Sequence, residues 1–432
     1  MRMLTAPDSG TPELVETDSQ LAATITQLKA GEGPIAIDAE RASGFRYSAR
    51  AYLIQLNRRS GGLHLIDPIA LQGSAQIREL DQLIHNQECI IHASSQDLTC
   101  LREFGLNPCK LFDTELGARL AGFPRVGLAP LCEALLEISL AKEHSAVDWS
   151  IRPLRSEWLD YAALDVAVLI DLKEKIEESL SAAGKLEWAK AEFAAALEME
   201  LQRPRSEPWR RTSGIHQIRS RFELAIIRNL WEARDLVARE IDLAPGRLLN
   251  DAVIIELARL KPATKSEFLA IPIVKFRIRN EVQTSYIDHW LTTLTNAYQV
   301  PETNWPEMRA RGDSLPAPRI WRDKFPIANA QLLHARKNLA EISTKLAIPQ
   351  ENLISPDALK RLLFNDGREV ATADSPKSRS EVSQTLAKYG VRKWQIELTL
   401  AALCQARGEV SPPPREPAET EPDGEAEPSE QV

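Results

Sequence analysis

The sequence predicts an α/β domain built on a mixed sheet, followed by two domains made only of helices. Strand and helix patterns alternate over about the first 200 residues, and strand patterns stop at the basic, proline-containing segment QRPRSEPWRR (202–211). The chain has 432 residues, which is more than one hydrophobic core usually holds. We therefore expect several domains.

The sheet begins with three short apolar segments. We expect strands over PIAIDAE (34–40), RAYLIQLNR (50–58) and GLHLIDP (62–68). The last two are joined by the short, glycine-containing RRSGG, and connections of this kind favour antiparallel pairing. The first part of the sheet is therefore predicted to be an antiparallel meander.

Two further strands follow, and each is reached through a helix. They are expected over ECIIHA (88–93) and KLFDT (110–114), with helices over about 74–86 and from Gln96 onward. Connections of that length imply parallel pairing. Helices continue from there to about residue 200, so the prediction is a mixed sheet with helices on its faces.

Beyond the basic segment, the pattern is helical throughout. IRSRFELAIIRNLWEARDLVARE (218–240) is a long amphipathic stretch, and MRARGDSLPAPRI (308–320) separates two blocks with a similar order of helices and turns. The expected organisation is a flexible N-terminus at 1–20, the α/β domain at 21–203, helical domains at 210–295 and 320–408, and a disordered acidic tail at 409–432.

The net charge of −8 is unevenly distributed along the chain. Residues 411–432 carry seven acidic residues and one Arg, a net charge of −6 that leaves −2 for the rest. This proline- and glutamate-rich tail has little to bury and is predicted to be disordered. Overall acidity therefore does not exclude a nucleic-acid partner.

Composition also bears on the cell compartment. There is no run of 18 apolar residues and no apolar segment typical of a secretory signal near the N-terminus, so neither a membrane span nor secretion is predicted. The five cysteines form no CxxC pair, which favours a reducing cytoplasm over disulfides or a zinc site. No feature indicates an obligate protein partner.

Four acidic residues follow strand ends or lie on a helix. Asp38 and Glu40 are two apart on one predicted strand and share a sheet face, although a strand end at solvent explains such a pair equally simply. Asp97 begins a helix, where the helix dipole also favours a carboxylate. Asp165 lies four residues after Tyr161 on a helical face, and Arg152 or Arg155 is its simplest alternative partner.

Gathered at one end of a sheet, these acids would suit hard divalent cations. Mg²⁺ and Mn²⁺ prefer carboxylate and water oxygens, and two such ions can clamp a phosphodiester.

The ordered set Asp-x-Glu, Asp97 in HASSQDL and Tyr-x-x-x-Asp in YAALDV resembles the three motifs of the DEDDy 3′-5′ exonucleases, which have a ribonuclease H-like fold. KEHSAVDWSIRPLRSEWLDYAALDV (142–166) is similar to the bacterial ribonuclease D family. The blocks near 209–290 and 321–408 resemble the HRDC and HRDC-like domains of that family.

The resemblance implies a metal-dependent 3′-5′ exoribonuclease that acts on tRNA precursors and releases nucleoside 5′-monophosphates. It implies two divalent cations, Mg²⁺ or Mn²⁺. Asp38 would bridge both ions, Glu40 and Asp165 would complete the first site, and Asp97 would support the second. Tyr161 would hold the attacking water; because a phenol has a pKa of about 10, we expect it to orient that water rather than deprotonate it.

The first motif departs from the family pattern. The family commonly has Asp-Thr-Glu-Phe, whereas this chain has DAER (38–41), with Ala39 for Thr and Arg41 for the aromatic residue. We expect Phe45 or Tyr47 to supply base stacking instead, or Arg41 to contact a base or phosphate.

Four other residues are candidate substrate contacts. The resemblance suggests that His92 and Ser95 touch the terminal nucleotide, the alternative being a helix-entry loop capped by Ser94 or Ser95. Trp149 and Arg152 would line the end near the scissile phosphate, and a structural packing pair is the alternative.

Residues 210–290 hold fourteen Lys and Arg against ten Asp and Glu, a net charge of +4. Possible phosphate contacts are Arg219, Arg221, Arg228, Arg247, Lys261, Lys265, Lys275, Arg277 and Arg279, and a solvated helical surface is the alternative for most of them.

Two other functions stay open at the level of sequence. One is a DNA 3′-5′ exonuclease in repair, because HRDC modules also accompany DNA helicases. The other is a non-catalytic scaffold for nucleic acid, which the presence of all four acids and the Tyr disfavours because clustered carboxylates repel phosphate.

Overall fold

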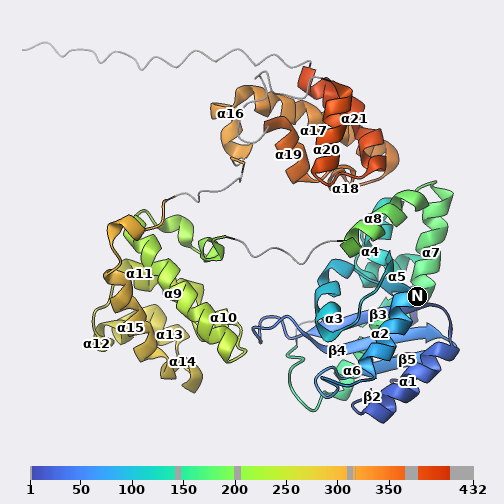
Figure 1. The fold of residues 1–432 in the computed structure, drawn as a ribbon, viewed down its shortest axis with the longest axis horizontal. Coiled ribbons are helices and arrows are strands. Elements are labelled where there is room, and N and C mark those ends of the chain that lie inside the picture. Colours follow the sequence, from blue (N-terminus) through green and yellow to red (C-terminus); the bar gives the residue numbers. More distant parts are fainter. Residues whose placement is uncertain are drawn as a thin grey trace, which may run out of the picture. The chain divides into compact units, whose positions relative to one another are not determined.

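The computed structural model describes residues 2–141, 147–198, 206–308, 315–316, 318–364 and 378–408. The chain divides into two compact units, Met1–Gly312 and Asp313–Val432 (Figure 1). None of the described helices combines the length and the apolar character needed to cross a membrane. The acidic tail predicted to be disordered lies outside the described residues.

A six-stranded mixed sheet forms the centre of the first unit, with strand order β2-β5-β4-β3-β6-β7. Its strands are β2 (Leu14–Val15), β3 (Glu32–Arg41), β4 (Ala51–Arg59), β5 (Gly62–Ile66), β6 (Glu88–Ile91) and β7 (Lys110–Asp113). β3, β4 and β5 pair antiparallel, and β6 and β7 extend the sheet in parallel from β3. The five predicted strands and their pairing directions are confirmed.

The first 20 residues, which we expected to be flexible, contain two short paired strands. β1 (Arg2–Leu4) pairs in parallel with β8 (Ile138–Leu140), and β2 pairs in parallel with β5. Strands of two or three residues are too short to show an alternating pattern, and they form through pairing with segments far away in the sequence. The N-terminal segment is therefore part of the α/β fold, a correction to the prediction.

Helices surround this sheet (Figure 1). They are α1 (Asp18–Ala30), α2 (Ile77–Asn86), α3 (Leu98–Phe104), α4 (Thr114–Ala121), α5 (Leu128–Leu135), α6 (Ser156–Ala167), α7 (Leu169–Ala182) and α8 (Leu186–Glu198). α6 packs on β3, β4 and β5, while α7 packs on β3 and β6. Leu53 of β4 packs beneath α6, and it is fully buried, as are Ile35 and Ile37 of β3.

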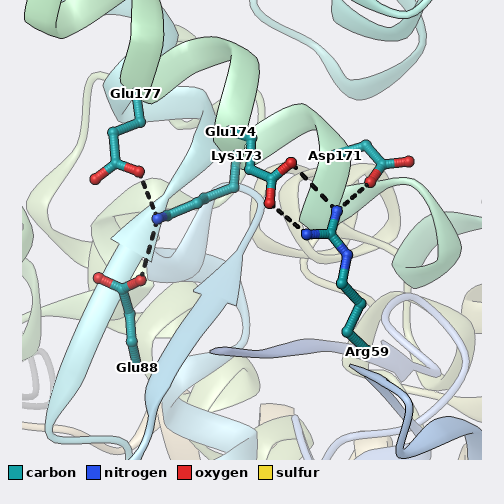
Figure 2. Close-up of polar contacts among 6 residues, drawn as sticks. All are labelled: Arg59, Glu88, Asp171, Lys173, Glu174 and Glu177. Atoms are coloured by element: carbon teal, nitrogen blue, oxygen red, sulfur yellow. Dashed lines mark hydrogen bonds and ion pairs between the residues drawn. The ribbon is translucent and has the colours of Figure 1, made fainter. Parts of the chain in front are cut away.

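An ion-pair network joins α7 to the sheet (Figure 2). Arg59 contacts Glu174 at 2.6 Å and Asp171 at 2.8 Å, both on α7. Lys173 lies between Glu177 at 2.6 Å and Glu88 of β6 at 3.5 Å. Residue 59 pairs with Glu32 at the start of β3, so the network lies at the opposite end of that strand from Asp38.

Beyond α8, the described residues of the first unit contain helices and no strand, as predicted. The α-helices are α9 (Arg221–Glu240), α10 (Pro245–Leu248), α11 (Asp251–Leu260), α12 (Lys265–Ala270), α13 (Pro272–Arg277), α14 (Glu281–Ser285) and α15 (Ile287–Tyr298). α9 packs against α11 and α15 around a core that includes Trp209 and Trp290. We call this part the first helical module.

The second unit has a helical core of its own. Its helices are α16 (Trp321–Lys324), α17 (Pro326–Leu346), α18 (Gln350–Leu353), α19 (Pro356–Phe364), α20 (Arg379–Lys388) and α21 (Lys393–Gly408). Trp321, Phe364 and Leu403 are fully buried in it, and the long helices α17 and α21 pack together. The strand-free pattern predicted for this part is confirmed for the described residues.

Candidate active site

Strand β3 carries two acids on one face. Alternation along the strand places Asp38 and Glu40 on the same side, while Ala39 between them points into the core and is only 6% exposed. Asp38 and Glu40 lie opposite Gln55 and Leu53 of β4. The small Ala39, where the family commonly has Thr, is therefore accommodated in the core and lies on the other face from the acids.

Helix α6 brings the third acid to this face. One turn of helix separates Tyr161 from Asp165, and the two side chains are hydrogen bonded to each other. One carboxylate oxygen from each of Asp38, Glu40 and Asp165 lies within 4.8 Å of the others. Asp38 and Glu40 are two residues apart on one strand, and Asp165 follows Glu40 by 125 residues. The three acids nevertheless form a single cluster.

The simplest alternative partners of Asp165 are engaged elsewhere. Arg152 forms an ion pair with Asp67, and the guanidinium of Arg155 stacks on the ring of Trp158 at 5.3 Å. No ion pair within the described residues joins Asp165 to a basic side chain. Its nearest charged neighbours in the cluster are the other carboxylates.

Asp97 approaches the cluster from the turn after β6. Ala93 adopts a left-handed conformation, and the Asp113 carboxylate accepts hydrogen bonds from the backbone N–H groups of Ala93 and Ser94, at 3.3 and 2.8 Å. The same carboxylate caps α4 by accepting from the backbone N–H of Leu116 at 3.0 Å, so Asp113 has a structural role. Asp97 is 4% exposed and is not among the three acids that lie within 4.8 Å of one another.

Arg41 is the basic side chain closest to these acids. Its Nε is 3.8 Å from Asp97 Oδ1, and its guanidinium also donates to Gln96 at 3.4 Å. The register of β3 against β4 shifts between Glu40 and Arg41, an irregularity of the kind that redirects a side chain. Arg41 therefore partly offsets the charge of Asp97, in the place where the family commonly has an aromatic ring.

The electrostatic environment disfavours ionisation of the acids. Removal from water raises the pKa of Asp38 to about 6, against the opposing effects of the Ala39 backbone N–H and Arg41. Burial, and then the charge of Asp38, raise the pKa of Glu40, Asp97 and Asp165 well above their usual values. A cation at this position would relieve both the desolvation and the mutual repulsion.

Tyr161 is held in its protonated form. Burial, followed by the charges of Asp165 and Glu40, raises the pKa of the phenol far above its ordinary value. The hydroxyl is therefore available as a hydrogen-bond donor and is a very weak base at neutral pH.

A cavity of about 370 Å³ opens beside the cluster. Asp38, Tyr161 and Asp165 form its polar side, together with His92. Its apolar side consists of Leu128, Ala129, Leu140, Ala141 and Leu169. The combination of an acidic wall and an apolar wall suits a ligand with both a phosphate and a planar ring, bridged to the acids by a cation.

Of the predicted nucleotide contacts, His92 lies in this cavity and Ser95 does not line it. The Nδ1 atom of His92 is 2.9 Å from Thr114 Oγ1, and burial lowers the pKa of the imidazole. Ser95 is exposed within the 3₁₀ turn Ser94–Gln96. Ser94 is the first residue of this turn and not its N-cap. The turn leads directly to Asp97.

Trp149 and Arg152 make structural contacts, which favours the packing alternative for these two residues. Trp149 is fully buried and packs edge-on against Trp158, with ring centroids 5.7 Å apart. Arg152 donates to both Asp67 oxygens, at 2.7 and 2.9 Å, and to the Tyr52 carbonyl. The aspartate that determines this arrangement lies 85 residues away in the sequence, so local sequence does not indicate it.

Phe45 and Tyr47 contact the first helical module and not the acidic cluster. The guanidinium of Arg247 lies 4.0 Å above the ring of Phe45, and the Tyr47 hydroxyl donates to Asp235 at 3.1 Å. Neither aromatic side chain lines the cavity beside the acids. Base stacking by Phe45 or Tyr47 stays a prediction, and it would have to take place outside this cavity.

Gln55 is a residue of the site that the sequence pattern did not predict. It lies directly opposite Asp38 on β4, is fully buried, and neither its amide nitrogen nor its amide oxygen has a hydrogen-bond partner in the described structure. A polar residue inside the apolar run YLIQLN was the available signal. Three converging carboxylates and an adjacent unpaired amide fit the oxygen-rich surroundings of a hydrated divalent cation.

Family models match most of the chain. A 3′-5′ exonuclease model matches residues 12–181, an HRDC domain model matches 223–281, and a 3′ to 5′ exonuclease C-terminal domain model matches 314–406. The exonuclease match contains all four acids and Tyr161.

Curated relatives point in the same direction. Ribonuclease D of Acidiphilium cryptum is 32% identical over 60% of this chain, and the match spans 66% of that relative, just under two thirds of its length. Ribonuclease D of Cronobacter turicensis is 30% identical over 62% of this chain and 72% of the relative.

Solved structures share the fold. A Bifidobacterium adolescentis protein superposes with a TM-score of 0.85 at 35% identity, covering 94% of this chain and 99% of that one. Escherichia coli RNase D, described as an exoribonuclease involved in structured RNA processing, has a TM-score of 0.65 at 24% identity over 91% and 98% of the two chains. With these matches and the acidic cluster in place, the chain belongs to the ribonuclease D family of 3′-5′ exonucleases.

Proposed function

We propose that this protein removes nucleotides one at a time from the 3′ end of RNA, with tRNA precursors as its substrates. The observation that carries the proposal is the convergence of Asp38, Glu40 and Asp165 within 4.8 Å in a chain of the ribonuclease D family. Water would attack the last phosphorus, the bond from phosphorus to the preceding 3′ oxygen would break, and that oxygen would take up a proton. The products are a nucleoside 5′-monophosphate and an RNA shorter by one nucleotide.

The carboxylates would hold two divalent cations, Mg²⁺ or Mn²⁺. Asp38 would contact both ions, Glu40 and Asp165 would complete one site, and Asp97, which is buried beside Arg41, would support the other. When bound, such ions supply activation of water and neutralisation of charge on the phosphate. Gln55 would donate a hydrogen bond to Asp38 or to a water between them, which would fix the carboxylate.

Tyr161 would orient the attacking water. Its hydroxyl stays protonated because burial and the neighbouring carboxylates raise its pKa, and its one proton is donated to Asp165. The phenol oxygen would therefore accept a hydrogen bond from the water without removing the proton. Its bond to Asp165 keeps the phenol close to that carboxylate.

The cavity beside the acids would receive the terminal nucleotide. Leu128, Leu140 and Leu169 offer an apolar wall for the base or ribose, and His92, neutral at pH 7, can form a hydrogen bond without adding charge. Arg41 is placed to exchange its contact with Asp97 for a contact with a phosphate once the acids are neutralised.

The test is nucleotide release from a tRNA precursor labelled at its 3′ end and from a DNA strand of matched sequence. Wild type and Asp165→Ala are compared with Mg²⁺, with Mn²⁺ and with a chelator, and Asp171→Ala serves as a control acid in the exposed network on α7. We expect stepwise, metal-dependent release from RNA that only Asp165→Ala abolishes. Release from DNA alone would reassign the polymer, and no release with binding intact would support a scaffold.

A further inference from the structure

Most basic side chains of the first helical module already have partners within the chain. Seven of the fourteen Lys and Arg at residues 210–290 form ion pairs with described acids: Arg210, Arg221, Arg234, Arg239, Arg259, Lys261 and Lys265. Arg221 and Arg228 also donate to backbone carbonyls of residues 304–306. The net positive charge of this module therefore overstates the cations that are free to bind phosphate.

The segment KFRIR (275–279) differs from the rest of the module. Lys275, Arg277 and Arg279 are exposed and form no ion pair within the described residues, although Glu281 follows two residues later. Between them, Phe276 is 58% exposed. The guanidinium carbons of Arg277 and Arg279 lie 5.1 and 4.8 Å from the centroid of its ring.

This exposed cluster is built on ordered backbone. Val274 and Ile278, four residues apart, are buried in the core of the module and fix the orientation of α13. Immediately afterwards, the Gln283 side chain accepts hydrogen bonds from the N–H groups of Arg279 and Asn280, at 2.9 and 3.3 Å. The exposure of Phe276 thus follows from the geometry of the helix, since its neighbours at 274 and 278 occupy the inward face.

We propose that Phe276, Arg277 and Arg279 form a stacking platform for an unpaired base of the RNA substrate, with Lys275 contacting the adjacent phosphate. The proposal rests on the proposed function and adds to it a contact in the first helical module. Aromatic rings and guanidinium planes both stack on bases, and every base has such a face, so the platform would select unpaired RNA without reading its sequence. The three cations of this segment form no ion pair within the described residues, although Arg279 Nε donates to the Lys275 carbonyl at 3.5 Å, and they supply the charge that phosphate requires.

The test is equilibrium binding of a fluorescently labelled oligoadenylate to the full chain, in chelator so that no cleavage takes place. Loss of one base stack is worth about 1–3 kcal/mol, so we expect Phe276→Ala to weaken binding about 5- to 150-fold. Phe276→Trp should retain binding, because it keeps the stacking surface. Leu236→Ala, which removes another strongly exposed apolar side chain of the module, should leave binding unchanged.

The salt dependence of binding separates the two kinds of contact. Each phosphate contact on a single strand contributes about 0.7 to the slope of log Kd against log salt, so Lys275→Gln should reduce that slope by about 0.7. Phe276→Ala should lower affinity with the slope unchanged.

Wild-type binding by all platform variants would overturn the proposal in favour of a protein-binding surface, and equal loss in Leu236→Ala would overturn it as non-specific. Nucleotide release by wild type and Asp165→Ala is measured separately. Release without an effect at Phe276 would therefore reject the platform alone, while platform binding without release would reject the exonuclease.

Discussion

The two ends of one sheet hold carboxylates in opposite electrostatic surroundings. At the start of β3, Asp171 and Glu174 are exposed and share the guanidinium of Arg59 (Figure 2), and hydrogen bonding to that group lowers the pKa of Glu174. At the other end, Asp38 and Asp165 face Glu40, and none of these three acids forms an ion pair with a basic side chain among the described residues. Burial raises the pKa values of Asp38 and Asp165.

The contrast distinguishes the paired carboxylates on α7, which stabilise the fold, from the acidic cluster, which serves the chemistry. Exposed ion pairs hold α7 against the sheet at small gain, because solvent screens them. Clustered acids withdrawn from water and lacking bases lower stability, and such an arrangement is typical of functional sites. The two sets can therefore be distinguished by what their removal does to activity and to stability.

The largest effect is expected for Asp38→Asn, which keeps the shape of the side chain and removes its charge. Because Asp38 is the central member of the acidic cluster, we expect nucleotide release to fall by about 10³-fold or more, corresponding to several kcal/mol of metal-derived stabilisation. Steady-state release from a 3′-labelled RNA measures it. Glu174→Gln is the matched control. A comparable loss of nucleotide release in Glu174→Gln would contradict the distinction between the two ends of the sheet.

A smaller loss is expected for Tyr161→Phe. Removing the hydroxyl leaves the four carboxylates in place, so metal affinity should change little while release slows by about 10²-fold, the low end for a positioned proton donor or acceptor. Metal titrations of release rate separate the two quantities. A large increase in the metal concentration needed for half-maximal rate would show instead that the phenol supports the ion site through Asp165.

The site could be predicted from sequence where the relevant spacing is local. The two-residue alternation of β3 predicts that Asp38 and Glu40 share a face, and the helical spacing predicts that Tyr161 adjoins Asp165. The surroundings of other candidates depend on distant partners and could not be predicted: Trp149 is buried by tertiary packing, and Arg152 is fixed by Asp67. Short strands such as β1 escaped notice because they exist only through pairing with β8.

Gln55 and Arg41 illustrate a second limit. Gln55 becomes notable only when the register places it opposite Asp38, and Arg41 reaches Asp97 only because the register shifts after Glu40. Strand pairing register is set by the whole sheet. A single sequence therefore shows that a polar residue lies on a strand, but not which residue it faces on the neighbouring strand.

A moderate effect on stability should accompany Asp165→Asn in chelator. A carboxyl whose pKa is raised on folding binds a proton more tightly in the folded state. The folded protein therefore loses stability as pH rises from the unfolded pKa near 4 through the folded pKa, which is about 6 for Asp38 and is raised well above its usual value for Asp165. We expect Asp165→Asn to raise Tm at pH 7.5 and to reduce the gain in Tm that wild type shows on acidification to pH 6.

Thermal unfolding with and without Mg²⁺ completes this test. The ion should raise the Tm of wild type at pH 7.5 more than that of Asp165→Asn, because it stabilises the folded state in which the carboxylates converge. Asp171→Asn, in the paired network, leaves the acidic cluster intact, so it should not raise Tm at pH 7.5 by itself and should keep the wild-type gain from Mg²⁺. A fall in Tm for Asp165→Asn would mean that the acidic cluster is structurally favourable without metal.

The smallest effect is expected for Arg59→Gln, which removes the base at the centre of the paired network. The side chain is more than half exposed, so we expect the free energy of unfolding to fall by at most about 1 kcal/mol, and by less at high salt, with nucleotide release unchanged. Denaturant unfolding at two salt concentrations measures it, with Lys190→Gln, from an isolated exposed pair with Glu187, as the control. A loss of activity would show that the position of α7 is transmitted to Asp165, since α6 and α7 are in contact and joined at residue 168, and the two ends of the sheet would then form one functional system.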